Sequence, residues 1–210
     1  EEIAAGAAPA RIVGIDPSDS QIEAARARPA IPGLSYQSGD VQALPFTDAS
    51  FDVATMALVI AFVPDPAKGL AELARVVRPG GTIAAYMWDL PAGVPLHPIY
   101  AEMREMGLGA PMPPSVGFAR LDRLVGLWTE TGLTQVTGQV IHITVSFEGF
   151  EDFWAANTLL VGPLAHTVAA MDPATRETLR DRVRARLAPA ADGRITYGAF
   201  ANAVKGVRAG

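Results

Sequence analysis

The sequence predicts an α/β fold, Rossmann-like and doubly wound around a mostly parallel sheet. Short apolar runs alternate with single helices over the first ninety residues, a pattern that predicts right-handed crossovers and a parallel sheet covered on both faces. Two later runs alternate apolar and polar residues, which indicates antiparallel strands at one edge. The chain has 210 residues, 50% hydrophobic and 19% charged. One globular domain is therefore expected.

The first half supplies the parallel strands and their helices. Glu1–Ala8 is typical of the tail of a helix, and the apolar run Arg11–Ile15 predicts a buried strand. Ser18 and Gln21 have the spacing of a capping box, which predicts a helix that ends near Arg28. The same reasoning predicts strands at Leu34–Ser38, Phe51–Ala57 and Thr82–Met87, and a helix from Pro66 to Val77 that Arg78–Gly81 ends.

The second half predicts helices inserted around two antiparallel strands. Residues 91–114 are rich in Pro, Gly and Met, and we expect an irregular insertion there rather than a core element. The helices are predicted at 115–131, ended by Gly132, and within 150–187, where Asp172 caps a helix that starts at Pro173. The strands are predicted at Thr134–Phe147 and at 194–204.

Charge and composition exclude several classes of function. The net charge of -5 argues against a nucleic-acid surface, which collects Lys and Arg on one face. The absence of cysteine excludes disulfides, a thiolate metal site and a cysteine nucleophile, and we expect no metal. The longest apolar stretch, Val53–Val63, is too short to cross a bilayer, which takes about 20 residues. Without a recognisable signal peptide, the cytoplasm is the default expectation.

Two acids follow neighbouring strands at the edge where open parallel sheets bind ligands. Asp16 follows Arg11–Ile15, and its carboxylate matches the vicinal hydroxyls of a ribose. Helix capping is the alternative, but Ser18 already occupies the cap position. Asp40 suits the exocyclic amine of adenine, with the backbone N–H of Val41 donating to a ring nitrogen. An Asx turn after Gly39 explains Asp40 equally well.

Four segments resemble class I S-adenosylmethionine-dependent methyltransferases in both order and spacing. The closest branch is type 11, similar to ubiquinone-biosynthesis enzymes, which methylates small molecules. The resemblance is close from Arg11 to Met87 and rests on topology beyond it. The four segments are Gly14–Ser18, Gly39–Phe46, Ser50–Val53 and Leu70–Gly81.

The resemblance implies a sheet with an antiparallel last strand, S-adenosylmethionine as cofactor and S-adenosylhomocysteine as product. It places Asp16 on the cofactor ribose and Asp40 with Val41 on the adenine. Ala57 matches the position whose main chain lies near the methionine part. Gln21 stands where the family usually has a methionine against the adenosine. The implied cofactor contacts are Asp16, Pro17, Gln21, Asp40, Val41 and Ala57.

The family's glycine-rich loop and the central strand before it have no counterpart in the sequence. Gly80–Gly81 cannot replace the loop, because it ends a helix. A sheet without its central strand leaves unpaired backbone groups, each costing about 1–3 kcal/mol if buried. We therefore expect that residues upstream of Glu1 exist, or that another segment fills the slot. The resemblance divides this single domain, residues 1–210, into a cofactor half at 1–90 and cap or substrate insertions at about 91–114 and 148–192.

The acceptor and the chemistry around it stay open. Ala61 and Phe62 replace a pair of histidines frequent in relatives, so no acid or base is carried over there. His97, in the first insertion, is a candidate for a general base, and a solvated loop histidine is the alternative. Some methionines and tryptophans suit a cap over a small, apolar acceptor, and ordinary core packing is the alternative: Met103, Met106, Met112, Trp88 and Trp154. A nicotinamide-dependent oxidoreductase and a non-catalytic binding domain are the rival functions, and a homodimer is one possible state.

Overall fold

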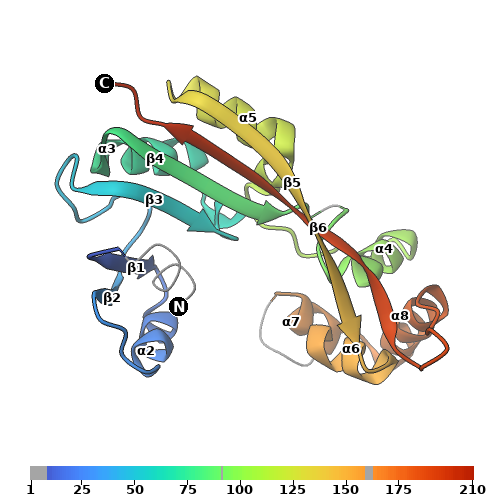
Figure 1. Ribbon diagram of the computed structural model, residues 1–210. Coiled ribbons are helices and arrows are strands. Elements are labelled where there is room, and N and C mark those ends of the chain that lie inside the picture. The colour runs from blue at the N-terminus through green and yellow to red at the C-terminus, as the bar shows by residue number, and fades with distance from the viewer. Residues whose placement is uncertain (1–8, 91, 159–162) are drawn as a thin grey trace.

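The computed structural model describes residues 9–90, 92–158 and 163–210 (Figure 1). The predicted helix at Glu1–Ala8 lies outside these residues. In chain order the elements are β1 (Ile12–Asp16), α2 (Asp19–Arg26), β2 (Leu34–Ser38), β3 (Phe51–Ala57), the 3-10 turn η1 (Ile60–Phe62), α3 (Pro66–Val76), β4 (Val77–Trp88), α4 (His97–Glu105), the 3-10 turn η2 (Val116–Ala119), α5 (Leu121–Glu130), β5 (Thr134–Phe147), α6 (Phe150–Thr158), α7 (Pro163–Ala169), α8 (Pro173–Arg186) and β6 (Ile195–Val207).

The strands form two sheets. β1 and β2 pair in parallel, with Asp16 opposite Ser38. The larger sheet has the order β3-β4-β6-β5, in which β3 and β4 are parallel and the other two pairs are antiparallel. The predicted α/β class and its antiparallel C-terminal strands are confirmed. Within the described residues, β1 pairs only with β2 and β3 only with β4, so no described strand joins the two sheets.

Helices α3 and α5 cover one face of the larger sheet. Leu70 and Leu73 of α3 and Trp128 of α5 are buried against strand residues such as Ile83 of β4. The Trp128 indole N–H also donates to the carbonyl oxygen of Ile83, at 3.0 Å, so its one polar atom is satisfied in the core. On the opposite face, Val53 and Tyr86 are exposed by 54% and 41%. The helices that cover this sheet therefore lie on one side of it.

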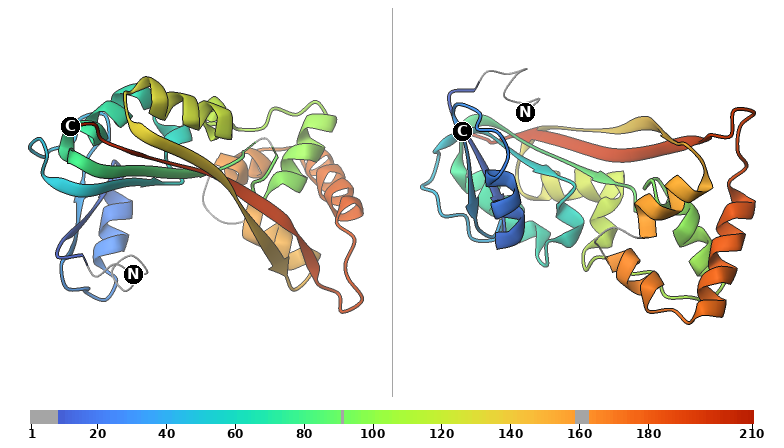
Figure 2. Two further views of the ribbon diagram at one scale, coloured as in Figure 1. Left: turned by 45° about the horizontal axis from the view of Figure 1, so that its top comes forward. Right: turned by 90° about the horizontal axis from the view of Figure 1, so that it is seen from below.

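A second core lies beyond the carboxyl end of β4. It is built from α4, α6, α7 and α8 together with the far ends of β5 and β6, and its centre includes Ile99, Phe153, Leu179 and Ile195. Figure 2 shows β5 and β6 as a long ribbon that runs from the sheet to this helical group. We call these four helices the cap.

Three element predictions were wrong in part. Residues 91–114 contain α4, in which Ile99 and Met103 are fully buried, so this segment does contribute to a core. β4 begins at Val77 because Phe51 pairs with Val77, and the predicted break at Gly80–Gly81 lies inside the strand. The helix predicted at 115–131 is interrupted at Arg120, whose extended backbone (ψ 141°) separates η2 from α5.

No helix of the described ranges combines the length and apolar character needed to span a bilayer.

Candidate functional site

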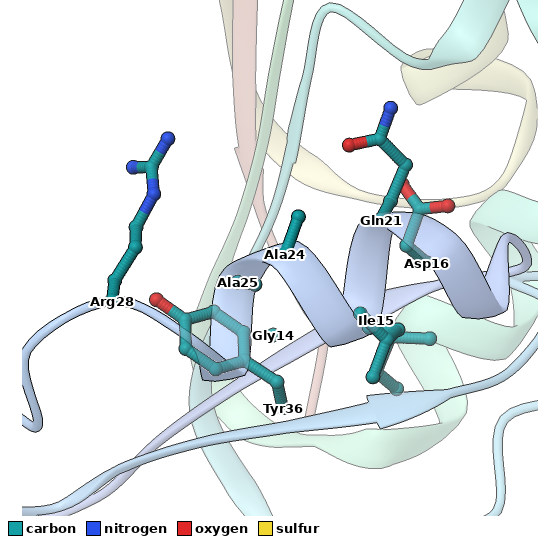
Figure 3. Close-up of a pocket in the computed structure, with 9 residues that line it drawn as sticks. Gly14, Ile15, Asp16, Gln21, Ala24, Ala25, Arg28 and Tyr36 are labelled. Atoms are coloured by element: carbon teal, nitrogen blue, oxygen red, sulfur yellow. The ribbon is translucent and has the colours of Figure 1, made fainter.

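A hollow of about 330 Å³ lies where β1 meets α2 (Figure 3). Asp16 and Gln21 lie at one end of it, and Arg28 and Tyr36 at the other. Gly14 also lines it, and a Cβ at this position would come within 2.7 Å of the Tyr36 ring. The glycine therefore makes room for the Tyr36 ring, which lies opposite it on β2.

Asp16 occupies the carboxyl end of β1. One of its carboxylate oxygens accepts a hydrogen bond from the backbone N–H of Ser18, at 2.8 Å. The Ser18 hydroxyl in turn accepts from the N–H of Gln21, which confirms Ser18 as the N-cap of α2. The expected return bond from the Gln21 side chain is absent, because Asp16 already occupies the Ser18 N–H. Asp16 thus has a structural role in the turn before α2, which we did not expect. No described residue bonds to its second carboxylate oxygen.

Asp40 lies just past the end of β2, the neighbouring strand. Its carboxylate accepts from the backbone N–H of Gln42 at 2.8 Å, which is the Asx turn considered for this residue. The Gln42 side chain donates to both Asp40 oxygens and accepts from the N–H of Asp65, the residue that caps α3. The backbone N–H of Val41 donates to no described residue. The turn therefore orients the Asp40 carboxylate and leaves the backbone N–H of Val41 able to donate to a ligand.

A charged pair on α3 holds the loop that follows Asp40. The Arg75 guanidinium donates to the carbonyl oxygens of Leu44 and Phe46 and to the carboxylates of Asp48 and Glu72. Glu72 also accepts from the N–H of Leu44 at 2.8 Å. The hydrogen bonds from Arg75 hold the pKa of Glu72 below its usual range, against the opposing effect of burial. Both members of the pair are consequently charged, and the loop is fastened to α3.

The other predicted cofactor contacts, Pro17 and Ala57, lie at strand ends of different sheets, and the end of β1 is joined to that of β2. The backbone N–H of Gly39 donates to the carbonyl oxygen of Asp16, at 3.1 Å, so the ends of β1 and β2 are joined. Pro17 directly follows Asp16 and does not line the hollow. Ala57 is the last residue of β3, on the other sheet, and Leu58 after it has a left-handed backbone (φ 59°) that few leucines adopt. The structure thus brings Asp16 and Gln21 into one hollow. Asp40 and Val41 follow the joined end of β2 without lining this hollow, and Ala57 lies on the other sheet.

His97 is the first residue of α4, within the cap and far from α2 in Figure 1. Burial lowers the pKa of its imidazole, and the positive charges of Arg104 and Arg186 lower it further. The imidazole is therefore neutral at pH 7. Within the described ranges, no cluster of three or more histidine or acidic side chains is arranged to hold a metal ion.

Sequence reasoning missed three residues that shape this region: Arg28, Tyr36 and Arg75. Tyr36 had a signal, because parallel pairing of the two predicted strands puts it opposite Gly14. Arg75 had no such signal, because its partners lie about thirty residues away in a loop whose conformation the sequence does not predict.

The chain is similar in sequence to known methyltransferases. Residues 2–85 match a family model described as a methyltransferase domain. An uncharacterized protein of Mycobacterium tuberculosis is 32% identical over 147 residues, which is 63% of this chain and 54% of that protein. A demethylmenaquinone methyltransferase of Corynebacterium kroppenstedtii is 30% identical over 154 residues, 64% of this chain and 65% of the enzyme. The chain thus spans between half and two thirds of the length of these curated relatives.

A solved structure supports the fold over the whole chain. The phosphoethanolamine N-methyltransferase 2 of Haemonchus contortus, in complex with S-adenosyl-L-methionine, superposes with a TM-score of 0.53. The superposition covers all of this chain and 45% of that one, at 14% identity. Residues 2–85 therefore match a methyltransferase-domain family model, and the chain has the class I methyltransferase fold.

Proposed function

We propose that this protein binds S-adenosylmethionine at the ends of β1 and β2 and transfers its methyl group to a small-molecule acceptor. The observation that carries the proposal is the pair of oriented carboxylates, Asp16 and Asp40, at the joined ends of two parallel strands. The methyltransferase relatives and the class I fold support the same activity.

The chain's own polar groups fit the adenosine of this cofactor. Asp16 has one oxygen engaged by Ser18 and the other open to a ribose hydroxyl. Asp40 presents a carboxylate for an amine, and Val41 a main-chain N–H for a ring nitrogen. Gln21 and Pro17 flank the ribose position, and Ala57 is assigned to the methionine end. When bound, the cofactor supplies a methyl group made electrophilic by its positive sulfur.

An exposed apolar group after β3 suits the acceptor. Val59 and Phe62 are exposed by 39% and 52%, and both follow the strand that ends at Ala57. Met112, 42% exposed, lies in the segment that the Ser115 N–H fastens to this turn by donating to the Ala61 carbonyl. These side chains favour an acceptor with apolar surface. Their task is to align it and exclude water, since methyl transfer depends mainly on orientation.

A hydroxyl acceptor would also lose a proton. His97 is the candidate to accept it, because its lowered pKa keeps the imidazole neutral at pH 7.

Thermal melting with two ligands tests the proposal. S-adenosylhomocysteine should raise the melting temperature of the 210-residue chain and NAD should not, because binding to the folded state alone is stabilising. Asp16→Asn should abolish the rise while keeping an oxygen that can accept the Ser18 N–H. Asp19→Asn is the matched control, as it removes the same charge from an exposed position in the first turn of α2. Equal melting with and without S-adenosylhomocysteine, together with no heat of binding in calorimetry, would exclude this function.

A further inference from the structure

β5 is an edge strand of the larger sheet. It pairs with β6 along Thr134–Phe147, and no described strand lies on its other edge (Figure 2). Every residue from Thr137 to Thr144 is exposed, although α5 lies over one face at Gly138, where a side chain would meet Val125 and Leu121. Its outward backbone N–H and C=O groups are available for pairing with another strand.

The sequence of β5 lacks the features that protect other edges. None of its fourteen residues is charged and none is proline. Its centre is β-branched and apolar, with Val140, Ile141 and Ile143 each exposed by 38–39%. Natural sheets normally protect long edges with lysine, proline or a bulge, because an apolar edge recruits a further strand. In β5 the one irregularity lies between Thr134 and Thr137, outside this apolar centre.

The chemistry of this edge favours a second copy of the same chain. A twofold axis perpendicular to the sheet makes two identical strands antiparallel. The two copies of each face then lie on the same side of the joined sheet. Residues that lie opposite each other are therefore both odd-numbered or both even-numbered. An axis at His142 puts Ile141 opposite the partner's Ile143, and Ile143 opposite the partner's Ile141. Val140 then faces the partner's Thr144. Apolar and β-branched cross-strand pairs are stabilising, and the strand brings no like charges together even though the chain carries a net charge of -5.

We propose that two copies of this protein join through β5, edge to edge and antiparallel, about an axis at His142. The pairing produces one continuous eight-stranded sheet from the two larger sheets, because each contributes β3-β4-β6-β5. The hollow between β1 and α2 lies on the other sheet, so this interface is independent of the proposed cofactor site.

Sedimentation equilibrium over a range of concentrations tests the assembly. The wild-type chain should dimerise, and Ile141→Lys combined with Ile143→Lys should raise the dimer dissociation constant at least about tenfold, since the lysines would face each other. Val59→Lys with Phe62→Lys is the matched control, because it places two lysines at comparably exposed apolar positions away from β5. Ile141→Thr with Ile143→Thr, which retains strand propensity, should weaken the dimer with less effect on folding.

A single cysteine tests the register. The chain has no cysteine, so His142→Cys creates a unique thiol. Facing residues of antiparallel strands have Cα atoms about 4.5–5.5 Å apart, within the range of a disulfide. Mild oxidation should therefore produce covalent dimers from His142→Cys and not from Thr178→Cys, on the exposed face of α8. A monomer at all concentrations, a dimer that tolerates the β5 lysines, or the absence of the His142→Cys cross-link would overturn the proposal.

Discussion

Asp16 and Arg75 show how single side chains serve both the fold and the site. The Asp16 carboxylate fixes the turn from β1 into α2 through one oxygen, and this contact also sets the direction of the other. A residue with two acceptor oxygens can perform both tasks at once. Capping and ligand binding are therefore compatible at this position.

Arg75 is expected to act on cofactor binding without touching the cofactor. Arg75→Ala removes the donors that hold Leu44, Phe46 and Asp48, so the loop after Val41 should loosen. We expect a lower melting temperature and an affinity for S-adenosylhomocysteine reduced by about tenfold, the loss of roughly one charged hydrogen bond. Calorimetric titration measures the affinity.

Arg78→Ala is the control for this variant. Arg78 also donates to a carboxylate, that of Asp52, but its side chain is 55% exposed and it holds no part of this loop. Its removal should leave both quantities nearly unchanged. Wild-type affinity in Arg75→Ala would show that the loop is held by other contacts.

At the scale of elements, local pattern predicted the strands best. β2, β3 and β5 have the predicted bounds, because apolar runs or strict alternation reach from one turn signal to the next. α4 was missed since proline and glycine surround it, although Ile99 and Met103 have the spacing of a buried helix face. The break at Arg120 could not be predicted, because Asn202, about eighty residues away, binds the carbonyl of Ala119 in the preceding turn. At the site, the sequence located the acids but not the contacts that orient them.

Two helices of the cap are held together by ion pairs. Glu102 and Glu105 of α4 bind Arg182 and Arg186 of α8, and the Glu102 side chain is only 5% exposed. Burial alone would raise the pKa of Glu102, but the hydrogen bonds and charges of the two arginines outweigh it, and the pKa is lowered. The α4–α8 contact is thus sensitive to acid.

Glu102→Gln should remove part of this acid sensitivity. A lowered folded-state pKa gives stability that is present above the unfolded value, about 4.3, and is lost as the pH falls through the folded value. We expect Glu102→Gln to lower the free energy of unfolding by about 1–3 kcal/mol at pH 7, with the difference from wild type shrinking below pH 4. Urea unfolding at several pH values measures it.

Glu105→Gln provides the comparison, because Glu105 has the same two partners but is 46% exposed. Its effect should be smaller, below about 1 kcal/mol. A difference between Glu102→Gln and wild type that is constant with pH would contradict the assigned pKa.

At the scale of the whole molecule, the two sheets differ in how well they are buried. Within residues 12–38, Ile22 is the only buried residue, whereas β4 and β6 contain several that are nearly inaccessible. Regions with few buried apolar contacts open at a lower free energy. The β1–α2–β2 unit should therefore be the first part of the described chain to open.

Amide hydrogen exchange tests this order. Exchange should be faster in β1, α2 and β2 than in β4 and β6, and S-adenosylhomocysteine should slow it chiefly in the former group, whose strand ends hold the proposed site. Mass spectrometry of peptic fragments resolves the two regions. Uniform exchange along the chain would show that the two sheets open as one cooperative unit.

The ribbon of β5 and β6 also determines how the cap can move. Its far half, where Val145 pairs with Tyr197, reaches the cap core, and its near half lies in the larger sheet. Since both cores share these two strands, a tilt of the cap has to twist the ribbon. The twist also displaces β4, because β4 is hydrogen-bonded to β6. Gly198 lies in this ribbon opposite Thr144, and it has open space where a side chain would be. A movement of the cap that closes over an acceptor would therefore distort the larger sheet.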